Sequence, residues 1–277
     1  MPTSTENIRR WIEQSDIDYI TNFIKAWIPF NAWYNASYPT LDSDRKKINK
    51  IKKDSNPVRN AINSYMESDS QEGLEFRSYL SSLHFNLQNS HLENSEGVIS
   101  FNSIIKEKNP KNLIDNEIIG HNKYYLRRVD AGPLGEISEI QIFLKRKNDN
   151  TTIFSYRHDT YDLNHLQAQQ AYIALSYPRK EQLRLYFKQL EPIIVTDLVQ
   201  YTLIESPKNY YKCDSYNFIR DINNTNCYAI FVCKGLIETL YQLRNILFHG
   251  ELIPNVATQK VYKEAYALLK LILDKIR

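Results

Sequence analysis

The strongest indication of fold in this chain lies in residues 228–250, which read YAIFVCKGLIETLYQLRNILFHG. Apolar side chains recur there at steps of 4, 3, 4, 3 and 4, which is the spacing of one face of an α-helix. They are Ala229, Cys233, Leu236, Leu240, Leu243 and Leu247. Gly250 follows as a natural helix stop. The stretch therefore predicts a long helix that buries one side against the rest of the protein.

The same helical spacing occurs near both ends of the chain. The segment 15–37 carries on one face Ile20, Ile24, Trp27, Asn31, Tyr34 and Tyr38. The segment after Pro254 carries Val261, Ala265, Leu268, Ile272 and Ile276. Shorter helices are indicated at 58–68 and 74–87. Helices of this kind bury their apolar faces against one another, and four of them with short connections form an antiparallel bundle.

The middle of the chain has a different character. Three runs, 123–129, 137–147 and 151–156, read as β-strands separated by turn-forming residues. Helical runs are expected at 166–175 and 181–204. These elements interrupt the helical pattern and indicate an inserted region that contains both helices and strands.

We therefore expect a mainly α fold, an antiparallel helical bundle with an α+β insertion between its second and third helices. Residues 1–90 form the N-terminal half of the bundle, 91–215 form the insertion, and 216–277 form the C-terminal half. The role of the insertion is not indicated. The low glycine content, 7 of 277 residues, agrees with this expectation, because tight turns in sheets and phosphate-binding loops both use glycine.

Composition argues against several other classes of protein. The chain has a net charge of +3 and no run of about 18 uninterrupted apolar residues, so we expect no membrane partner and no membrane-spanning helix. The N-terminal residues lack the basic and then apolar layout of a secretion signal, and we expect a cytoplasmic protein. The three cysteines contain no C-x-x-C pair, so no metal site and no cofactor is expected.

Three chemically distinctive residues, Arg244, Asn245 and His249, stand at the end of the predicted helix 228–250 and away from its apolar face. A guanidinium is a permanent bidentate partner for phosphate, and an imidazole transfers protons near neutral pH. Together these groups can cleave RNA without a metal. A base activates the 2′-hydroxyl, whose oxygen attacks the adjacent phosphorus, and an acid protonates the 5′ leaving oxygen. The products are a 2′,3′-cyclic phosphate and a 5′-hydroxyl.

The arrangement Arg244-Asn245-x-x-x-His249 resembles the R-x4–6-H motif of the HEPN superfamily. The segment 27–34, WIPFNAWY, is similar to the aromatic first helix of many HEPN proteins. The resemblance covers about 16–88 and 228–277. It implies a helical bundle, a metal-independent endoribonuclease with Arg244 and His249 as the catalytic pair and Asn245 as their assistant, and a homodimer whose two motifs share one cleft. HEPN proteins include toxins, anti-phage abortive-infection effectors and CRISPR-associated nucleases.

The sequence therefore predicts an endoribonuclease that acts on RNA such as tRNA or mRNA, as a toxin or anti-phage effector under the control of an antitoxin or a phage-derived trigger. The alternative is a non-catalytic HEPN-type binding module that partners a nucleotidyltransferase antitoxin or another defence protein. The intact Arg244, Asn245 and His249 argue against that alternative. A surface histidine whose cation suits the end of a helix dipole is the simpler explanation of His249 alone.

Three other residues are candidates for supporting this site. Asn31 either assists the site or satisfies backbone groups freed by Pro29. Glu238 lies on the same side of its helix as Asn245, where it either orients an imidazole or is solvated. Tyr241 is close enough to the motif to be a site of inhibition by adenylylation, which requires a partner protein.

Two basic stretches are candidate RNA contacts. The segment 45–53, expected to be a charged loop, contains Arg45, Lys46, Lys47, Lys50, Lys52 and Lys53. It either binds phosphates or is a solvated linker. The second stretch is on the predicted strands, where Arg127, Arg128 and the run 145–147 are interleaved with Tyr124, Tyr125 and Phe143. Cations alternating with aromatic rings can hold single-stranded RNA, but a strand with one apolar and one charged side has the same pattern.

Overall fold

The computed structural model describes residue 8 and residues 18–95, 97–132, 136–201, 206–223 and 227–277. The chain divides into two compact units. The first unit is formed by Met1–Ile105 together with Thr196–Arg277, and the second unit is formed by Lys106–Val195. The second unit is therefore an insertion in the chain of the first.

The expectation of a mainly α fold is wrong, because 51% of the structure is helical and 22% is strand. The strands form four antiparallel sheets, one of them with four strands. The protein is a mixed α and β structure and not a mainly α helical bundle. The low glycine content was misleading because Asn150 and Asp214, which lie in turns between strands, adopt the left-handed backbone conformation instead. Asn and Asp tolerate that conformation better than other side chains, so turns between strands can form without glycine.

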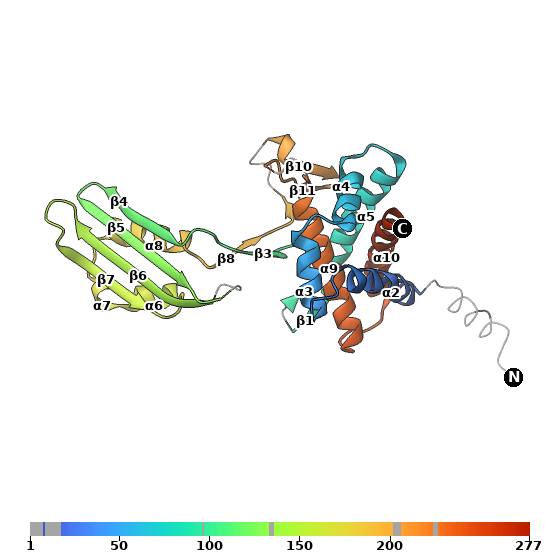
Figure 1. Cartoon of the computed structure of the whole chain (residues 1–277), viewed down its shortest axis with the longest axis horizontal. Helices are drawn as coiled ribbons and strands as arrows, with labels where there is room; N and C mark the ends of the chain where they lie inside the picture. Colours follow the sequence, from blue (N-terminus) through green and yellow to red (C-terminus); the bar gives the residue numbers. More distant parts are fainter. Residues whose placement is uncertain (1–7, 9–17, 96, 133–135, 202–205, 224–226) are drawn as a thin grey trace. The chain divides into compact units, whose positions relative to one another are not determined.

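The first unit holds the long helices. They are α2 (Tyr19–Ser37), α3 (Asp44–Lys53), α4 (Pro57–Glu67), α5 (Gln71–Ser90), α9 (Ile230–Phe248) and α10 (Val256–Ile276). Helix α10 packs against α2, α4 and α5, and α9 packs against α3 and α4 (Figure 1). Side-chain caps begin these helices: Asp18 accepts from the backbone of α2, Ser43 from α3 and Asn56 from α4. Such caps satisfy amides at a helix start that have no partner within the helix.

The apolar face predicted for α10 is confirmed, because Val261, Ala265, Leu268 and Ile272 are all buried. The face of α2 is displaced from the predicted one. Its buried residues are Phe23, Ala26, Trp27, Phe30 and Tyr34. The predicted Ile20, Ile24, Asn31 and Tyr38 flank this face and are half-buried. Two phenylalanines at helical spacing bury more apolar area than two isoleucines, so they turn α2 toward the core.

Helix α9 is buried on most of its circumference. Besides the predicted face, it buries Val232, Ile237, Glu238, Tyr241 and Ile246. The side that the sequence suggested as outward is covered by α3, which packs directly on α9. Segment 45–53 is thus a helix and not the expected charged loop. It buries Ile48 and Ile51, whose spacing of three residues places them on one side of a helix.

Short strands complete the first unit. They are β1 (Glu93–Asn94), β2 (Gly97–Val98), β9 (Val199–Gln200), β10 (Tyr210–Cys213) and β11 (Tyr216–Ile219), with the 3-10 turn η1 (Pro207–Asn209) before β10. The helix predicted at 181–204 is wrong over residues 190–201, and residues 202–204 of that prediction lie outside the described residues. Pro192 has no amide hydrogen to continue a helix, and the β-branched run Ile193–Thr196 forms strand β8. Strand β8 pairs with β3 (Ile105–Lys108).

The second unit is built on a four-stranded antiparallel sheet in the order β4-β5-β6-β7. Its strands are β4 (Leu113–Ile119), β5 (Asn122–Asp130), β6 (Ile137–Arg146) and β7 (Thr152–His158). The three strands that the sequence predicted are confirmed as β5, β6 and β7, whereas β4 was not predicted. The helices α6 (Leu163–Ala168), α7 (Gln170–Ile173) and α8 (Tyr177–Gln189) follow.

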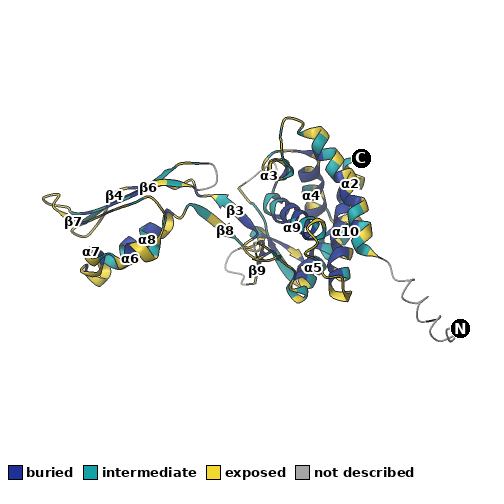
Figure 2. Ribbon diagram, turned by 90° about the horizontal axis from the view of Figure 1, so that it is seen from below, coloured by how far each residue is buried: buried dark blue, intermediate teal, exposed yellow. Residues whose placement is uncertain are grey.

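Only one face of this sheet is covered. Buried side chains of the strands, such as Leu126, Ile142 and Leu144, pack with Leu183 and Phe187 of α8. Figure 2 shows α6, α7 and α8 together on one side of the sheet. Alternate residues of each strand point away from the helices, because successive side chains of a strand lie on opposite faces. The second face of the sheet is therefore available to solvent within this unit.

Candidate functional site

The residues predicted to be catalytic lie in the last turn of α9 and just beyond it. Helix α9 ends at Phe248, His249 is its C-cap residue, and Gly250 has a φ of 69°. The backbone amide of His249 donates to the carbonyl of Asn245 over 2.9 Å. The His249 side chain is exposed, and its imidazole has no hydrogen-bond or ion-pair partner among the described residues. The ring is therefore accessible to a ligand.

Arg244 is held in place from three sides. Its Nη1 donates to Oδ1 of Asn245 over 3.1 Å, and its Nη2 lies 3.3 Å from Oδ2 of Asp44. Its guanidinium carbon lies 4.5 Å from the centre of the Phe248 ring. The side chain is 21% exposed. A positioned, partly exposed guanidinium fits an anion, but Asp44 already neutralises part of its charge.

Behind Arg244, polar side chains of α2 and α3 form a network of polar contacts. The phenol of Tyr34 neighbours the Asp44 carboxylate. The amide of Asn31 donates to the Tyr34 hydroxyl over 2.6 Å, and the amide of Asn35 donates to Oδ1 of Asn31 over 2.6 Å. Lys47 donates to Asn35 at the far end. The network thus links Arg244 of α9 to Asn31 of α2 through Tyr34 and Asp44.

Tyr34 is the buried centre of this network. Burial and the neighbouring Asp44 carboxylate raise the pKa of its phenol well above the ordinary value, and Arg244 opposes the shift only in part. The hydroxyl therefore stays protonated and can donate to Asp44 while it accepts from Asn31. This arrangement fixes Asp44, which in turn orients the guanidinium of Arg244.

Glu238 is not on a solvated surface, because it is 4% exposed. Its two carboxylate oxygens accept from Arg45, over 2.6 Å, and from Lys52, both on α3. Burial acts to raise the pKa of Glu238, but Lys52 and Arg45 outweigh it and hold that pKa below the ordinary value. Glu238 therefore joins α3 to α9, and among the described residues it makes no contact with His249 that would orient the imidazole.

Tyr241 is buried beside the same ion pairs, with 9% of the residue exposed. The guanidinium of Arg45 lies 5.4 Å from the centre of its ring, and the ring of Trp27 lies 6.5 Å away. A modifying enzyme needs an accessible hydroxyl. The burial of Tyr241 therefore weighs against the hypothesis that this tyrosine is adenylylated in the folded protein.

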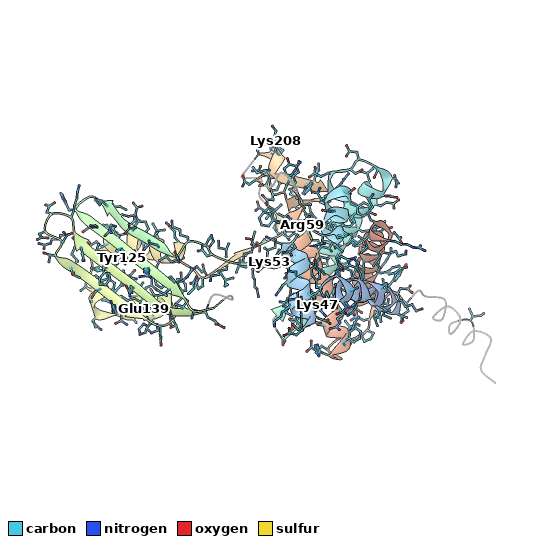
Figure 3. The ribbon with its side chains drawn as sticks, viewed as in Figure 1. Lys47, Lys53, Arg59, Tyr125, Glu139 and Lys208 are labelled. Atoms are coloured by element: carbon cyan, nitrogen blue, oxygen red, sulfur yellow. The ribbon has the colours of Figure 1, made fainter. Side chains whose placement is uncertain are left out.

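Most cations of segment 45–53 are bound within the protein. Lys46 pairs with Asp42 and Lys50 with Asp54, each over one helical turn. Arg45 and Lys52 pair with Glu238, and Lys47 bonds to Asn35, as described above. Lys53 is exposed. Figure 3 labels Lys47 and Lys53 at different ends of α3. Intramolecular pairing explains most of this basic cluster without RNA.

The adjacent Arg127 and Arg128 of β5 have opposite surroundings. Arg127 is exposed, whereas Arg128 is 1% exposed. Nε of Arg128 donates to Asp130 over 2.6 Å, and Nη2 donates to the carbonyl of Asn109 over 2.7 Å. Its Nη1 donates to the carbonyl of Leu190, at the end of α8. Arg128 is thus a buried structural residue and cannot contact RNA in this fold.

The structure brings into the network two residues that the sequence analysis did not select for the site, Asp44 and Tyr34. Tyr34 was assigned only to the apolar face of its helix, although it lies three residues after Asn31. Asp44 directly precedes the basic run that begins at Arg45. Neither position stands out by type or spacing, because the contact between α3 and α9 exists only in the folded chain.

The chain beyond the motif carries an unusual number of exposed apolar side chains. Phe248, Ile253 and Val256 are 59%, 78% and 75% exposed. They lie within nine residues of sequence, between the end of α9 and the start of α10. Exposed apolar groups of this size that occur together are typical of surfaces that contact another protein.

None of the helices in the described ranges combines the length and apolar character that a membrane crossing requires. In the same part of the chain, His, Cys, Asp and Glu side chains form no group of three or more that could hold a metal ion. Comparison of the chain with models of known protein families finds no match, and neither the curated proteins nor the solved structures contain a match.

Proposed function

We propose that this protein is a metal-independent endoribonuclease whose catalytic residues are Arg244 and His249. The observation that supports the proposal is the exposed imidazole of His249 at the end of α9, which has no partner among the described residues. It stands five residues after a guanidinium held by Asp44 and Asn245. The residues of the HEPN-like motif thus offer an accessible imidazole and an oriented cation, which are the two groups that RNA transesterification needs.

The reaction assigns a distinct task to each residue. A neutral His249 removes the proton of the ribose 2′-hydroxyl, and the oxygen forms a bond to the adjacent phosphorus. The bond from phosphorus to the 5′ oxygen breaks, and a protonated His249 supplies a proton to that oxygen. Arg244 stabilises the negative charge that develops on the phosphoryl oxygens. Asn245 and Asp44 hold the guanidinium during this step.

A second copy of the chain completes the site in this proposal. At about 100° per residue, Arg244 and His249 point about 140° apart on one helix, so one copy does not direct both at the same phosphate. A two-fold contact through this helix end supplies two imidazoles, one as base and one as acid. The exposed Phe248, Ile253 and Val256 offer apolar area for such a contact.

The decisive experiment compares two histidines at helix C-caps, His249 of α9 and His91 of α5. Both are exposed, but only His249 follows an arginine by five positions. Purified wild type, His249→Asn and His91→Asn are incubated with total RNA and with tRNA in EDTA, and the ends of the products are analysed. We expect 2′,3′-cyclic phosphate and 5′-hydroxyl ends from wild type.

We expect His249→Asn to lose about 100- to 10,000-fold in rate, the usual contribution of acid–base catalysis. His91→Asn should cleave like wild type. Equal activity of His249→Asn and wild type contradicts the proposal, as does loss of all wild-type activity in EDTA. Circular dichroism of both variants checks that the fold is retained.

The dimer is tested by light scattering after size-exclusion chromatography. Wild type should have twice the mass of one chain, and Ile253→Asp with Val256→Asp should have the mass of a single chain and little cleavage activity. Retention of full activity by a monomeric variant rules out the shared site. This outcome would leave the assignment of His249 itself unaffected.

The biological role that fits this activity is that of a toxin or anti-phage effector, held inactive by an antitoxin or released by a phage-derived trigger. Expression of the wild type in bacteria should arrest growth, and expression of His249→Asn should not. Growth arrest by both proteins argues against RNA cleavage as the cause.

A second function, a non-catalytic binding module for a nucleotidyltransferase antitoxin or other defence protein, is favoured by one observation. Arg244 is already bound to Asp44 and Asn245 and is stacked with Phe248, which are the contacts of a structural arginine. The same cleavage assay separates the two functions, because a binding module produces no cyclic phosphate ends at any concentration.

A further inference from the structure

The uncovered face of the sheet in the second unit carries a pair of aromatic rings. Tyr125 of β5 and Phe143 of β6 are directly opposite in the strand register. Their ring centres lie 6.0 Å apart with an angle of 42° between the rings. Both are half-buried. The core of the unit lies on the other face, so these rings contribute nothing to the packing under α6, α7 and α8.

The two rings belong to a depression in the sheet surface. It is lined by Asn116, Lys123, Tyr125, Gln141, Phe143 and Lys145. Its volume is about 250 Å³, a little below the range of roughly 300–1,000 Å³ that is common for small-molecule sites, so it is a shallow surface and not a deep pocket. Figure 3 labels Tyr125 on this sheet. The lining combines aromatic faces, amides and two ammonium groups, and it contains no carboxylate.

Positive charge predominates on this face of β5, β6 and β7. In the register of β5 and β6, Lys123 is opposite Lys145 and Arg127 is opposite Gln141. On its other side, Gln141 is opposite Arg157 of β7. The only acidic residue on this face of β5, β6 and β7, as the register defines it, is Glu139. Glu139 lies 3.8 Å from Arg157. Lys123 and Lys145 have no acidic partner among the described residues, and Nζ of Lys145 lies 5.7 Å from the centre of the Phe143 ring.

Two lysines opposite each other on adjacent strands repel, because like charges in directly paired positions destabilise a sheet. A ligand with negative charge relieves this repulsion. Half-buried rings on an uncovered face, flanked by cations, match a ligand that alternates planar bases with phosphates, since bases stack on aromatic side chains and phosphates bind cations. An acidic protein surface would satisfy the cations but would leave the two ring faces without flat partners.

We propose that the uncovered face of β5 and β6 binds single-stranded RNA, with bases stacked on Tyr125 and Phe143 and phosphates held by Lys123 and Lys145. The choice of RNA over DNA rests on the proposed function, whereas the stacking and the charge complementarity do not. The proposal excludes Arg128, which is buried, and includes the exposed Arg127 as an additional phosphate contact. Base pairing hides the faces of bases, so duplex RNA should bind poorly.

Fluorescence anisotropy of the full-length protein tests the proposal with a 12-nucleotide single-stranded RNA that is 2′-O-methylated throughout. This probe cannot supply the attacking 2′-hydroxyl, so binding is measured separately from cleavage. We expect Tyr125→Ala and Phe143→Ala each to weaken binding about 10-fold and the double variant about 100-fold. The binding constant K falls with salt concentration. In the double variant Lys123→Ala with Lys145→Ala, the slope of log K against log[salt] should be less steep by about 1.4, because two phosphate contacts are lost.

The helices on the opposite face provide matched controls. Tyr177 of α8 is 76% exposed, and Lys188 of the same helix is exposed. Tyr177→Ala and Lys188→Ala remove the same chemical groups and should leave binding unchanged. The thermal midpoint of each variant checks that the sheet is intact.

The inference is overturned if the wild type does not bind the probe. It is also overturned if Tyr125→Ala with Phe143→Ala binds like wild type, or if a duplex of the same length binds as tightly as the single strand. Failure of this test with intact cleavage leaves the proposed nuclease in place. Binding of the probe by a protein that cleaves no RNA would support this inference and contradict the proposed nuclease.

Discussion

The two units of this protein contain similar clusters of cations and aromatic rings but use them differently. In the first unit, Arg45 and Lys52 are bound by the buried Glu238, and Arg244 is bound by Asp44. In the second unit, Lys123 and Lys145 lie beside Tyr125 and Phe143 with no acidic partner among the described residues. A basic cluster in a sequence is thus a candidate surface for RNA only where the fold does not supply its own carboxylates.

The neighbours Arg127 and Arg128 repeat this contrast within one strand. One side chain is exposed on the uncovered face of the sheet, and the next is enclosed beneath the helices. Strand geometry alone causes the difference, because successive side chains alternate between faces. The experiments below test the contrast between internally paired and available cations, beginning with the largest expected effect.

Arg128→Met should destabilise the second unit by about 4 kcal/mol, because removal of one partner of a buried ion pair leaves other buried groups unsatisfied. The carbonyls of Asn109 and Leu190 lose their donor, and Asp130 keeps only Lys108. Hydrogen exchange should accelerate across residues 106–195. Arg127→Met is the matched control and should affect RNA binding but not exchange. Equal exchange in the two variants would show that Arg128 is not a structural residue.

Glu238→Gln should destabilise the first unit by about 3 kcal/mol, because the half-buried Lys52 ammonium then lacks its counter-charge. The amide can still accept hydrogen bonds but carries no charge. Urea denaturation followed by circular dichroism measures the change. Glu251→Gln, at an exposed position after the motif, should have little effect. A Glu238→Gln protein as stable as wild type would mean that α3 is held on α9 by apolar contacts alone.

Acid should weaken the first unit through His84. This residue is 0% exposed and lies between the rings of Phe101 and Tyr216, and burial lowers its pKa from 6.5 to about 4. Between these two pH values the imidazole of His84 therefore binds a proton in the unfolded chain but not in the folded chain. Stability present above pH 6.5 is lost as the pH falls toward 4, by about 3 kcal/mol at pH 4.

The measurement for His84 is the free energy of unfolding from pH 7 to pH 4, in wild type and in His84→Phe. Other groups titrate in both proteins, so the difference between the two curves isolates this residue. The unfolding free energy of His84→Phe, relative to that of wild type, should rise by about 3 kcal/mol as the pH is lowered from 7 to 4. Parallel curves would mean that His84 gains access to water. The control is His91→Asn, which replaces an exposed histidine of the same unit. Its curve of unfolding free energy against pH should be parallel to that of wild type.

Gly250→Ala should have the smallest effect, a loss of about 1 kcal/mol in unfolding free energy. The φ of 69° favours glycine, and no atom would collide with the added methyl group. Gly250→Asn should cost less, because asparagine tolerates this conformation better. Urea denaturation distinguishes the two. If Ala and Asn are equally stable, the backbone at the end of α9 adjusts, and His249 is less firmly positioned than proposed.

Local patterns predicted several elements well. The stripes in α9 and α10 and the strands β5, β6 and β7 depend on residues that are close in sequence, so periodicity was sufficient. The failures came from longer-range effects. The prediction at 181–204 joined a helix and strand β8 across Pro192, and β10 with β11 was treated as a polar stretch because each strand is four residues long.

For the candidate site, the residue types and spacing of Arg244, Asn245 and His249 could be recognised in the sequence, but their surroundings could not. Glu238 was placed on an open side of α9 because one helix was considered without its neighbours. Helix α3 covers that side and pairs with Glu238 from more than 180 positions away in the sequence. Such a contact has no local signature.

The sequence by itself determined where α2, α9 and α10 and the strands β5, β6 and β7 form, where α9 ends, and which residues could exchange protons or hold a phosphate. It could do so because backbone geometry and side-chain chemistry are properties of neighbouring residues. Only the tertiary structure decided which cations are neutralised, that Tyr34 and Asp44 hold Arg244, and which face of the sheet is uncovered. Those properties depend on burial and on partners distant in the chain, which exist only when the helices and strands pack together.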